Sequence, residues 1–198
     1  MSVKGDKTKQ DIKEKAYCLF AEKGYKNVTM KDICEQTGLS RGGLYRHYES
    51  TEQIFLEIVS AFSNKQKAEI ESKIKNHIPA IVILNELLAK YADEMVDSKN
   101  SLTLAIYEYY SNPEISKNDN SVIKQYEISK SAWIELINYG IATKEFNCVN
   151  PQAVFNVIVF AYQGVRMYSK LMKIDKDIPN QIIDEIKGLL LSKEVQNG

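Results

Sequence analysis

Apolar residues recur along almost the whole chain at the three-to-four-residue spacing of α-helices, and no stretch alternates like a half-buried strand. The four prolines fall where helices can begin, and Asn150-Pro151 combines an N-cap residue with proline at the first helical position. The pattern predicts an all-α chain of about nine helices. We expect them at about residues 6–23, 30–36, 40–47, 51–76, 80–97, 101–111, 119–143, 151–172 and 178–193.

Chain length and charge distribution narrow the classes of function. At 198 residues the chain can build one sizeable core or two small ones. Its 26 basic and 26 acidic side chains cancel, which excludes a bulk polyelectrolyte. Residues 1–50, however, hold ten Lys and Arg against seven Asp and Glu, a balance of +3, and the remainder holds 16 against 19, a balance of −3. A basic N-terminal part suits a nucleic-acid contact.

No feature of an exported or membrane protein is visible. The three cysteines, Cys18, Cys34 and Cys148, are an odd number without a C-x-x-C pair, which indicates a reducing compartment. Residues 1–15 lack the apolar core of a signal peptide. The most apolar stretch, residues 153–165, is shorter than the roughly 18 residues of a membrane span. We therefore expect a cytoplasmic protein without a membrane partner.

The first quarter of the chain has the pattern of a helix-turn-helix unit. Thr29, with Asp32 three residues later, predicts a capping box at the start of a helix. The sequence TGLS follows, in which Gly38 supplies a left-handed turn residue, Leu39 faces the core and Ser40 caps the next helix. A helix, a short glycine-containing turn and a second short helix are the unit that places its second helix in the DNA major groove.

Gly42 and Gly43 stand side by side in this second helix, where each costs about 1 kcal/mol relative to alanine. One interpretation is that the missing side chains let the backbone approach DNA bases, while Arg41 reaches a guanine in bidentate fashion. The other is that the glycines only loosen a helix stabilised by packing of Leu44 and Tyr48. We favour the first interpretation.

From Ile12 to Ile54 the chain resembles the N-terminal DNA-binding domain of TetR-family transcriptional regulators, and the segment FAEKGY before the helix-turn-helix is part of the likeness. The matching residues are Ile12, Ala16, Phe20, Gly24, Tyr25, Thr29, Ile33, Gly38, Leu39, Ser40, Leu44, Tyr45, His47 and Tyr48. The resemblance implies a homodimeric repressor. Its DNA-binding domain would be residues 1–50, and residues 51–198 would bind a small-molecule effector and the second subunit.

The resemblance also implies a set of DNA-binding residues. They are Thr29, Lys31, Ser40, Arg41, Gly42, Gly43, Tyr45, Arg46 and His47. Thr29 and Lys31 match positions that contact the DNA backbone, Arg41 with the two glycines matches the base-reading positions, and the last three match positions that meet phosphates or outer bases.

One departure from the family lies at the start of the fourth helix. The usual lysine that anchors this helix on phosphate is absent, and Thr51 stands there with Glu49 nearby. Ser50 with Gln53 predicts a capping box, and the free amide groups of that helix start are an alternative phosphate contact.

Polar-tipped aromatic residues gather beyond residue 90, where eight of the twelve tyrosines and the only tryptophan lie. Ligand pockets combine aromatic walls with a few convergent polar groups. The candidate walls are Tyr91, Tyr107, Tyr110, Tyr126, Trp133 and Phe155, with Gln163 or Asn156 as the polar group. For any single residue, ordinary helix packing with an exposed tyrosine tip is the alternative.

The helix at residues 151–172 is apolar nearly all round and the last helix has a broad apolar face, so both need cover on more than one side. We expect them to form an isologous four-helix interface with a second subunit, and a single larger core is the alternative. The expected interface residues are Val154, Val157, Ile158, Ala161, Val165, Ile182, Ile186 and Leu189.

These patterns predict a dimeric repressor on a near-palindromic double-stranded DNA operator, released by a small, largely apolar or aromatic ligand. The sequence shows no nucleophile–base pair, fixed carboxylate pair, phosphate-binding glycine loop or metal cluster, so we expect neither catalysis nor a cofactor. Two alternatives remain open. One is a regulator controlled by a protein partner or by thiol oxidation, with Cys34 as the candidate thiol, and the other is a small-molecule-binding protein that does not bind DNA.

Overall fold

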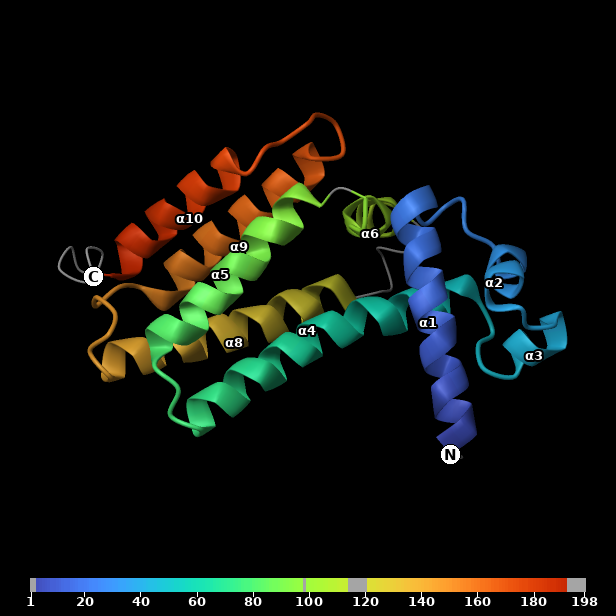
Figure 1. Ribbon diagram of the computed structural model, residues 1–198, viewed down its shortest axis with the longest axis horizontal. Helices are drawn as coiled ribbons and strands as arrows, with labels where there is room; N and C mark the ends of the chain where they lie inside the picture. Colours follow the sequence, from blue (N-terminus) through green and yellow to red (C-terminus); the bar gives the residue numbers. More distant parts are fainter. Residues whose placement is uncertain (1–2, 98, 114–120, 192–198) are drawn as a thin grey trace. The chain divides into compact units, whose positions relative to one another are not determined.

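The computed structural model describes residues 3–97, 99–113 and 121–191, and within these ranges the chain forms nine α-helices and no strand (Figure 1). The helices are α1 (Val3–Lys23), α2 (Met30–Thr37), α3 (Arg41–Tyr45), α4 (Thr51–Lys75), α5 (Ala80–Val96), α6 (Thr103–Tyr110), α8 (Ser121–Ala142), α9 (Pro151–Tyr168) and α10 (Asp177–Leu190). The predicted all-α fold is confirmed. The third helix is shorter than expected because Ser40 and Arg46 are its caps and not members of it.

Local capping signals explain several of these boundaries. The Thr29 hydroxyl accepts the Asp32 N–H at 3.2 Å and the Asp32 carboxylate accepts the Thr29 N–H at 2.9 Å, which is the predicted capping box of α2. Gly38 ends α2 with φ at 72°, and its N–H donates to the Cys34 carbonyl at 2.9 Å. The Asn150 side chain accepts two N–H groups at the start of α9. Hydrogen bonds between residues close in the sequence therefore fix these helix ends.

Contacts divide the chain into two compact units. The N-terminal unit comprises residues 1–62 and 99–122, and the C-terminal unit comprises residues 63–98 and 123–198. Helix α4 contributes to both, and α6, although it follows α5 in the chain, belongs with the first three helices. The contact-based units therefore differ from the predicted division at residue 50, which stays a prediction about function.

The N-terminal unit is built around a buried aromatic cluster formed by Phe20, Tyr25, Phe55 and Tyr109. The ring centroids of neighbouring members lie 4.8 to 6.0 Å apart. The cluster joins the end of α1, the turn before α2, the first half of α4 and α6, so the helix-turn-helix rests on α4 and α6. Phe20, Phe55 and Tyr109 are fully buried and Tyr25 is half-buried, and fully burying a large apolar side chain stabilises a fold by about 1.5–3 kcal/mol.

In the C-terminal unit α5, α9 and α10 pack against one another, and α8 and the last part of α4 complete the core. Trp133 of α8 and Phe155 of α9 are among the largest fully buried side chains. The buried residues of α9 recur at helical spacing, with Val154, Ile158 and Tyr162 on one side of the helix.

Candidate functional site

Helix α3 presents its polar face outward because one large side chain anchors it. Leu44 is fully buried, while Arg41 and Gly42 are exposed. The Ser40 hydroxyl accepts the Gly43 N–H at 3.1 Å, so the predicted N-cap is present. Tyr48, which follows α3, is buried in the core of the unit.

The two adjacent glycines of α3, Gly42 and Gly43, differ in how much room the structure leaves for a side chain. Neither has the positive φ that favours glycine. A Cβ at Gly43 would stand 3.2 Å from the Ser40 hydroxyl oxygen, so the N-cap leaves little room there. A Cβ at Gly42 would have no atom within 4 Å. Gly42 therefore lowers the helix propensity of α3, and neither side-chain packing nor backbone conformation in the described residues requires a glycine there.

Basic side chains flank this open backbone. The Arg41 guanidinium lies 5.6 Å from the centre of the Tyr45 ring, and both side chains are exposed. Arg46 is also exposed, just after α3. Lys31 on α2 is exposed, with its ammonium 3.8 Å from the Glu35 carboxylate. All nine predicted DNA-binding residues therefore lie on α2, α3 and the residues beside them, whereas the Thr29 hydroxyl is engaged in the capping box.

Lys9 is a basic residue that the sequence interpretation missed. Its ammonium lies 5.0 Å from the centre of the Tyr48 ring, so α1 brings a cation to the end of the helix-turn-helix. The excess of basic residues before residue 50 was the only signal for it in the sequence.

The start of α4 has a modified form of the predicted capping box. The Ser50 hydroxyl accepts the Gln53 N–H at 3.2 Å, and the Gln53 side chain accepts the N–H of Glu49 at 2.9 Å. Two backbone donors at this helix start are thus already satisfied within the chain.

Asp32 is the acidic residue in the first turn of α2. Hydrogen bonds from Thr29, followed in strength by the Lys23 ammonium at 2.9 Å, hold the pKa of the Asp32 carboxyl well below its usual range. The carboxylate is therefore charged at neutral pH, at the helix end where negative charge is favourable.

The aromatic residues predicted to line one pocket fall into both units. Tyr107 and Tyr110 are on α6 in the N-terminal unit, where Tyr107 is exposed and the Tyr110 hydroxyl is bonded to that of Ser121. Tyr91, Tyr126, Trp133 and Phe155 belong to the C-terminal unit. Gln163 is exposed. The six predicted wall residues are therefore divided between the two units, because α6 packs with α1.

Buried rings and hydroxyl groups meet around Tyr91 in the C-terminal unit. Its hydroxyl accepts the Trp133 indole N–H at 3.3 Å and the Gln66 amide at 2.8 Å. The ring stacks on Tyr162, with 4.2 Å between the centroids. Burial raises the pKa of both tyrosines, so their hydroxyl groups stay neutral. We call Gln66, Tyr91, Trp133 and Tyr162 the Tyr91 cluster.

Polar groups border this cluster. The Arg166 guanidinium lies 4.9 Å from the centre of the Tyr162 ring and donates to the Tyr162 hydroxyl, which in turn donates to the Glu94 carboxylate. Elsewhere in the unit, Tyr126 contacts Phe155 with 5.3 Å between centroids, and its hydroxyl donates to the side-chain oxygen Oδ1 of Asn156 at 2.9 Å. Asn156, rather than Gln163, is therefore the polar partner of a predicted wall residue.

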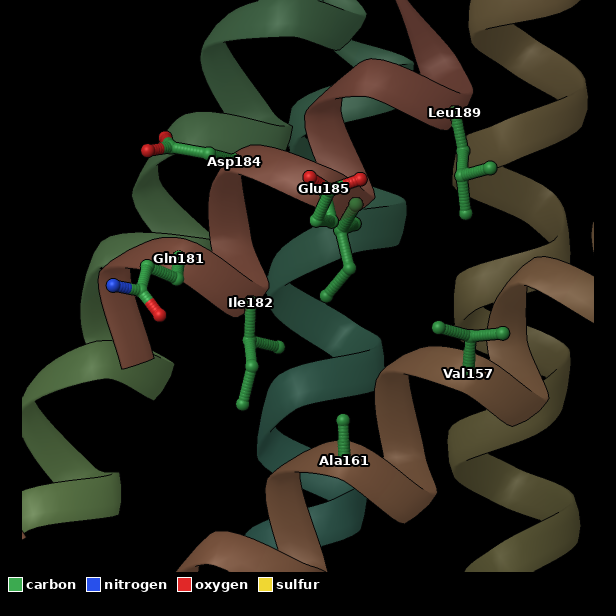
Figure 2. Close-up of a pocket in the computed structure, with 8 residues that line it drawn as sticks. Val157, Ala161, Gln181, Ile182, Asp184, Glu185 and Leu189 are labelled. Carbon is green, nitrogen blue, oxygen red and sulfur yellow. The ribbon is translucent and has the colours of Figure 1, made fainter. Parts of the chain in front are cut away.

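The predicted interface residues of α9 and α10 point in two directions. Val154, Ile158 and Ile186 are buried in the unit's own core, so the structure leaves little of their surface for a second subunit. Val157 and Leu189 are exposed, and Ala161, Val165 and Ile182 are half-buried. A groove of about 660 Å³ runs between α9 and α10. Figure 2 shows Val157 and Ala161 of α9 and Ile182 and Leu189 of α10 pointing into it.

The helix-turn-helix geometry agrees with the similarity to known proteins. Residues 12–58, which contain the capping box, the Gly38 turn and α3, match the family model described as bacterial regulatory proteins, tetR family. Residues 12–58 therefore carry the DNA-binding segment of TetR-family regulators. This segment is the DNA-binding part of a transcriptional regulator.

Relatives extend the similarity beyond the DNA-binding segment. The uncharacterized HTH-type transcriptional regulator YfiR of Bacillus subtilis is 28% identical over 149 residues, 75% of this chain and 72% of the relative. The biofilm operon icaADBC HTH-type negative transcriptional regulator IcaR of Staphylococcus epidermidis is 27% identical over 189 residues, 92% and 96% of the two chains. A regulator from Saccharomonospora viridis, solved in complex with choline, has the same fold, with a TM-score of 0.71, 17% identity, and coverage of 95% and 100%.

The described residues contain neither a candidate metal site nor a candidate membrane span. No three His, Cys, Asp or Glu side chains in these ranges gather as a metal ion would require. No helix there combines the length and apolar character needed to cross a membrane.

Proposed function

We propose that this chain is a TetR-family repressor that binds a near-palindromic operator as a homodimer and leaves it when a small, largely apolar or aromatic ligand binds. Gly42 is the observation that carries the DNA-binding part of this proposal. Its backbone is exposed, beside Arg41, and nothing within the chain accounts for the missing side chain. A surface that approaches α3 within the length of a Cβ accounts for it, and the major groove admits a helix in this way.

The apolar surface of α9 and α10 supports the homodimer. Val157 and Leu189, which are 48% and 46% exposed, line the groove between the two helices. Phe160 of α9, which is 65% exposed, lines a second hollow together with Ile178 and Ile182 of α10. Exposed apolar surface of this kind marks an interaction site. A second copy offers the same surface, so an isologous contact covers both copies at once and spaces two α3 helices for two half-sites.

The Tyr91 cluster supports a small-molecule effector. In this proposal its rings, and the Tyr126–Phe155 pair elsewhere in the unit, would supply the aromatic walls of a ligand site, and the Gln66 amide would supply a polar group. A ligand there acts only through the difference between its affinities for the DNA-binding and released states. Helix α4 has residues in both units and is the proposed connection.

Selection of bound duplexes from a random DNA pool by the purified protein, at two salt concentrations, tests the proposal. We expect an enriched near-palindrome whose half-sites lie about 34–36 Å apart, or a multiple of this, with an affinity that falls as salt rises. Absence of any enriched duplex at both salt concentrations contradicts the operator-binding function. Titration of an enriched duplex with lipophilic and aromatic compounds then tests release by a ligand.

A further inference from the structure

A carboxylate from α6 binds the turn that leads into the helix-turn-helix. One oxygen of Glu108 accepts the N–H groups of Tyr25 at 2.7 Å and Lys26 at 3.1 Å. These residues stand 83 and 82 positions away in the chain. Charge-assisted hydrogen bonds of this kind are among the stronger contacts in proteins.

Gly24 makes this contact sterically possible. Its φ of +77° is a conformation that glycine adopts without strain. A Cβ at this position would lie 2.5 Å from the Glu108 oxygen and 2.9 Å from its carboxyl carbon. Successive N–H groups beside a left-handed residue form a concave site for an anion. In this chain the anion is supplied by Glu108.

The next residue of α6 binds the other side of the helix-turn-helix. The Tyr109 ring packs edge-on against Tyr25, with 4.8 Å between the centroids. Its hydroxyl donates to the Glu52 carboxylate, in the first turn of α4, at 2.7 Å. Two consecutive residues of α6 thus hold the turn before α2 and the helix after α3.

We propose that Glu108 is a positioning residue for operator binding. Its carboxylate sets where the Gly24–Lys26 turn lies on α6, and hence where α2 and α3 lie relative to the start of α4. The role rests on the proposed function, because it matters only if two α3 helices read two half-sites at a set spacing. A carboxylate would be repelled by phosphate, so Glu108 acts through the turn and not by contacting DNA.

Three variants test this role. Glu108→Ala removes the acceptor, Glu108→Gln keeps an amide oxygen that can accept the same N–H groups, and Glu22→Ala removes an exposed carboxylate near the end of α1 as a matched control for charge. The probes are the duplex enriched by the wild-type protein, the same duplex with its half-site spacing changed by one base pair in either direction, and a random duplex. Amide hydrogen exchange at Tyr25 and Lys26 reports the turn itself.

We expect Glu108→Ala to speed exchange at both amides and to bind the selected duplex about tenfold more weakly, because the population with correctly placed α3 helices falls. The Glu108→Ala protein should discriminate less between duplexes with the original and the altered half-site spacing, while its affinity for random duplex stays unchanged. Glu108→Gln should restore most of the affinity, and Glu22→Ala should match the wild type.

Equal losses on selected and random duplexes would mean general destabilisation and would overturn the positioning role. Faster exchange at Tyr25 and Lys26 with unchanged operator affinity and spacing preference would overturn it as well. These results differ from failure of the proposed function, in which the wild-type protein itself enriches no duplex and the role of Glu108 falls with it.

Discussion

At the scale of single residues, Gly42 differs from the other glycines near the helix-turn-helix. Gly24 and Gly38 have positive φ, and Gly43 faces its own N-cap, whereas Gly42 has open space around the missing side chain. We therefore expect the advantage of glycine at position 42 to depend on the surface that approaches α3 from outside the chain.

Replacing Gly42 by alanine separates stability from DNA binding. We expect Gly42→Ala to raise the free energy of unfolding by about 0.5–1 kcal/mol, because alanine is the better helix former, and to weaken operator binding by obstructing close approach. Thermal unfolding and operator titration measure the two effects. Gly43→Ala is the control, with no gain in stability expected because of the Ser40 contact. Undiminished operator affinity in Gly42→Ala would contradict the close-approach interpretation.

Arg41 is the residue from which we expect base recognition. Arg41→Ala should weaken binding to the selected operator by about 1–3 kcal/mol and leave binding to random DNA nearly unchanged, because a bidentate contact to guanine is lost. Binding titrations on both duplexes measure this. Lys31→Ala serves as the comparison, since a phosphate contact should weaken binding to both duplexes alike. An equal loss on both duplexes for Arg41→Ala would show that it contacts the backbone only.

At the scale of helices, the N-terminus of α2 depends on one charged side chain. The pKa of Asp32 is lower in the folded protein than in the unfolded chain. Its contribution to stability is therefore present above the unfolded pKa of about 3.9 and is lost as pH falls through the folded pKa. Asp32→Asn removes the charge at every pH.

We therefore expect the wild type to be more stable than Asp32→Asn by a constant margin at neutral pH, and this margin should shrink below about pH 4. Thermal unfolding of both proteins between neutral and acid pH measures the margin. Glu35→Gln is a control on the same helix, where the carboxylate lies 3.8 Å from an exposed Lys31 ammonium. A margin that does not change with pH would show that Asp32 acts by its hydrogen bonds alone.

Helix α6 shows what the pattern of one element does and does not predict. Its existence near residues 101–111 follows from apolar spacing, and the structure has it at Thr103–Tyr110. The unit that it joins is decided by contacts of Glu108 and Tyr109 with residues more than fifty positions away. Because these long-range contacts cannot be read from helical spacing, the sequence interpretation placed Tyr107 and Tyr110 in one pocket with residues of the other unit.

At the scale of the whole molecule, the apolar surface of α9 and α10 is the proposed dimer contact. Val157→Glu should convert the proposed dimer into monomers at micromolar concentration, because it places a charge in the centre of an apolar contact. Analytical ultracentrifugation measures the change. Val82→Glu is the matched control, since Val82 is similarly exposed, at 40%, on α5. A Val157→Glu protein with the same sedimentation as the wild type would exclude this surface from the dimer.

The sequence alone determined the helices, their caps and the helix-turn-helix, because these depend on residues within about four positions of one another. Thr29 with Asp32, Gly38 and Asn150 are examples, and each has the predicted cap in the structure. Only the tertiary structure decided which side of each helix is covered. Val154 and Val157 look alike in the sequence, yet one is buried and the other exposed. The hydrogen bonds from the turn after Gly24 to Glu108 could not be predicted from the sequence either. They join residues up to 83 positions apart, whose proximity depends on the packing of the whole unit.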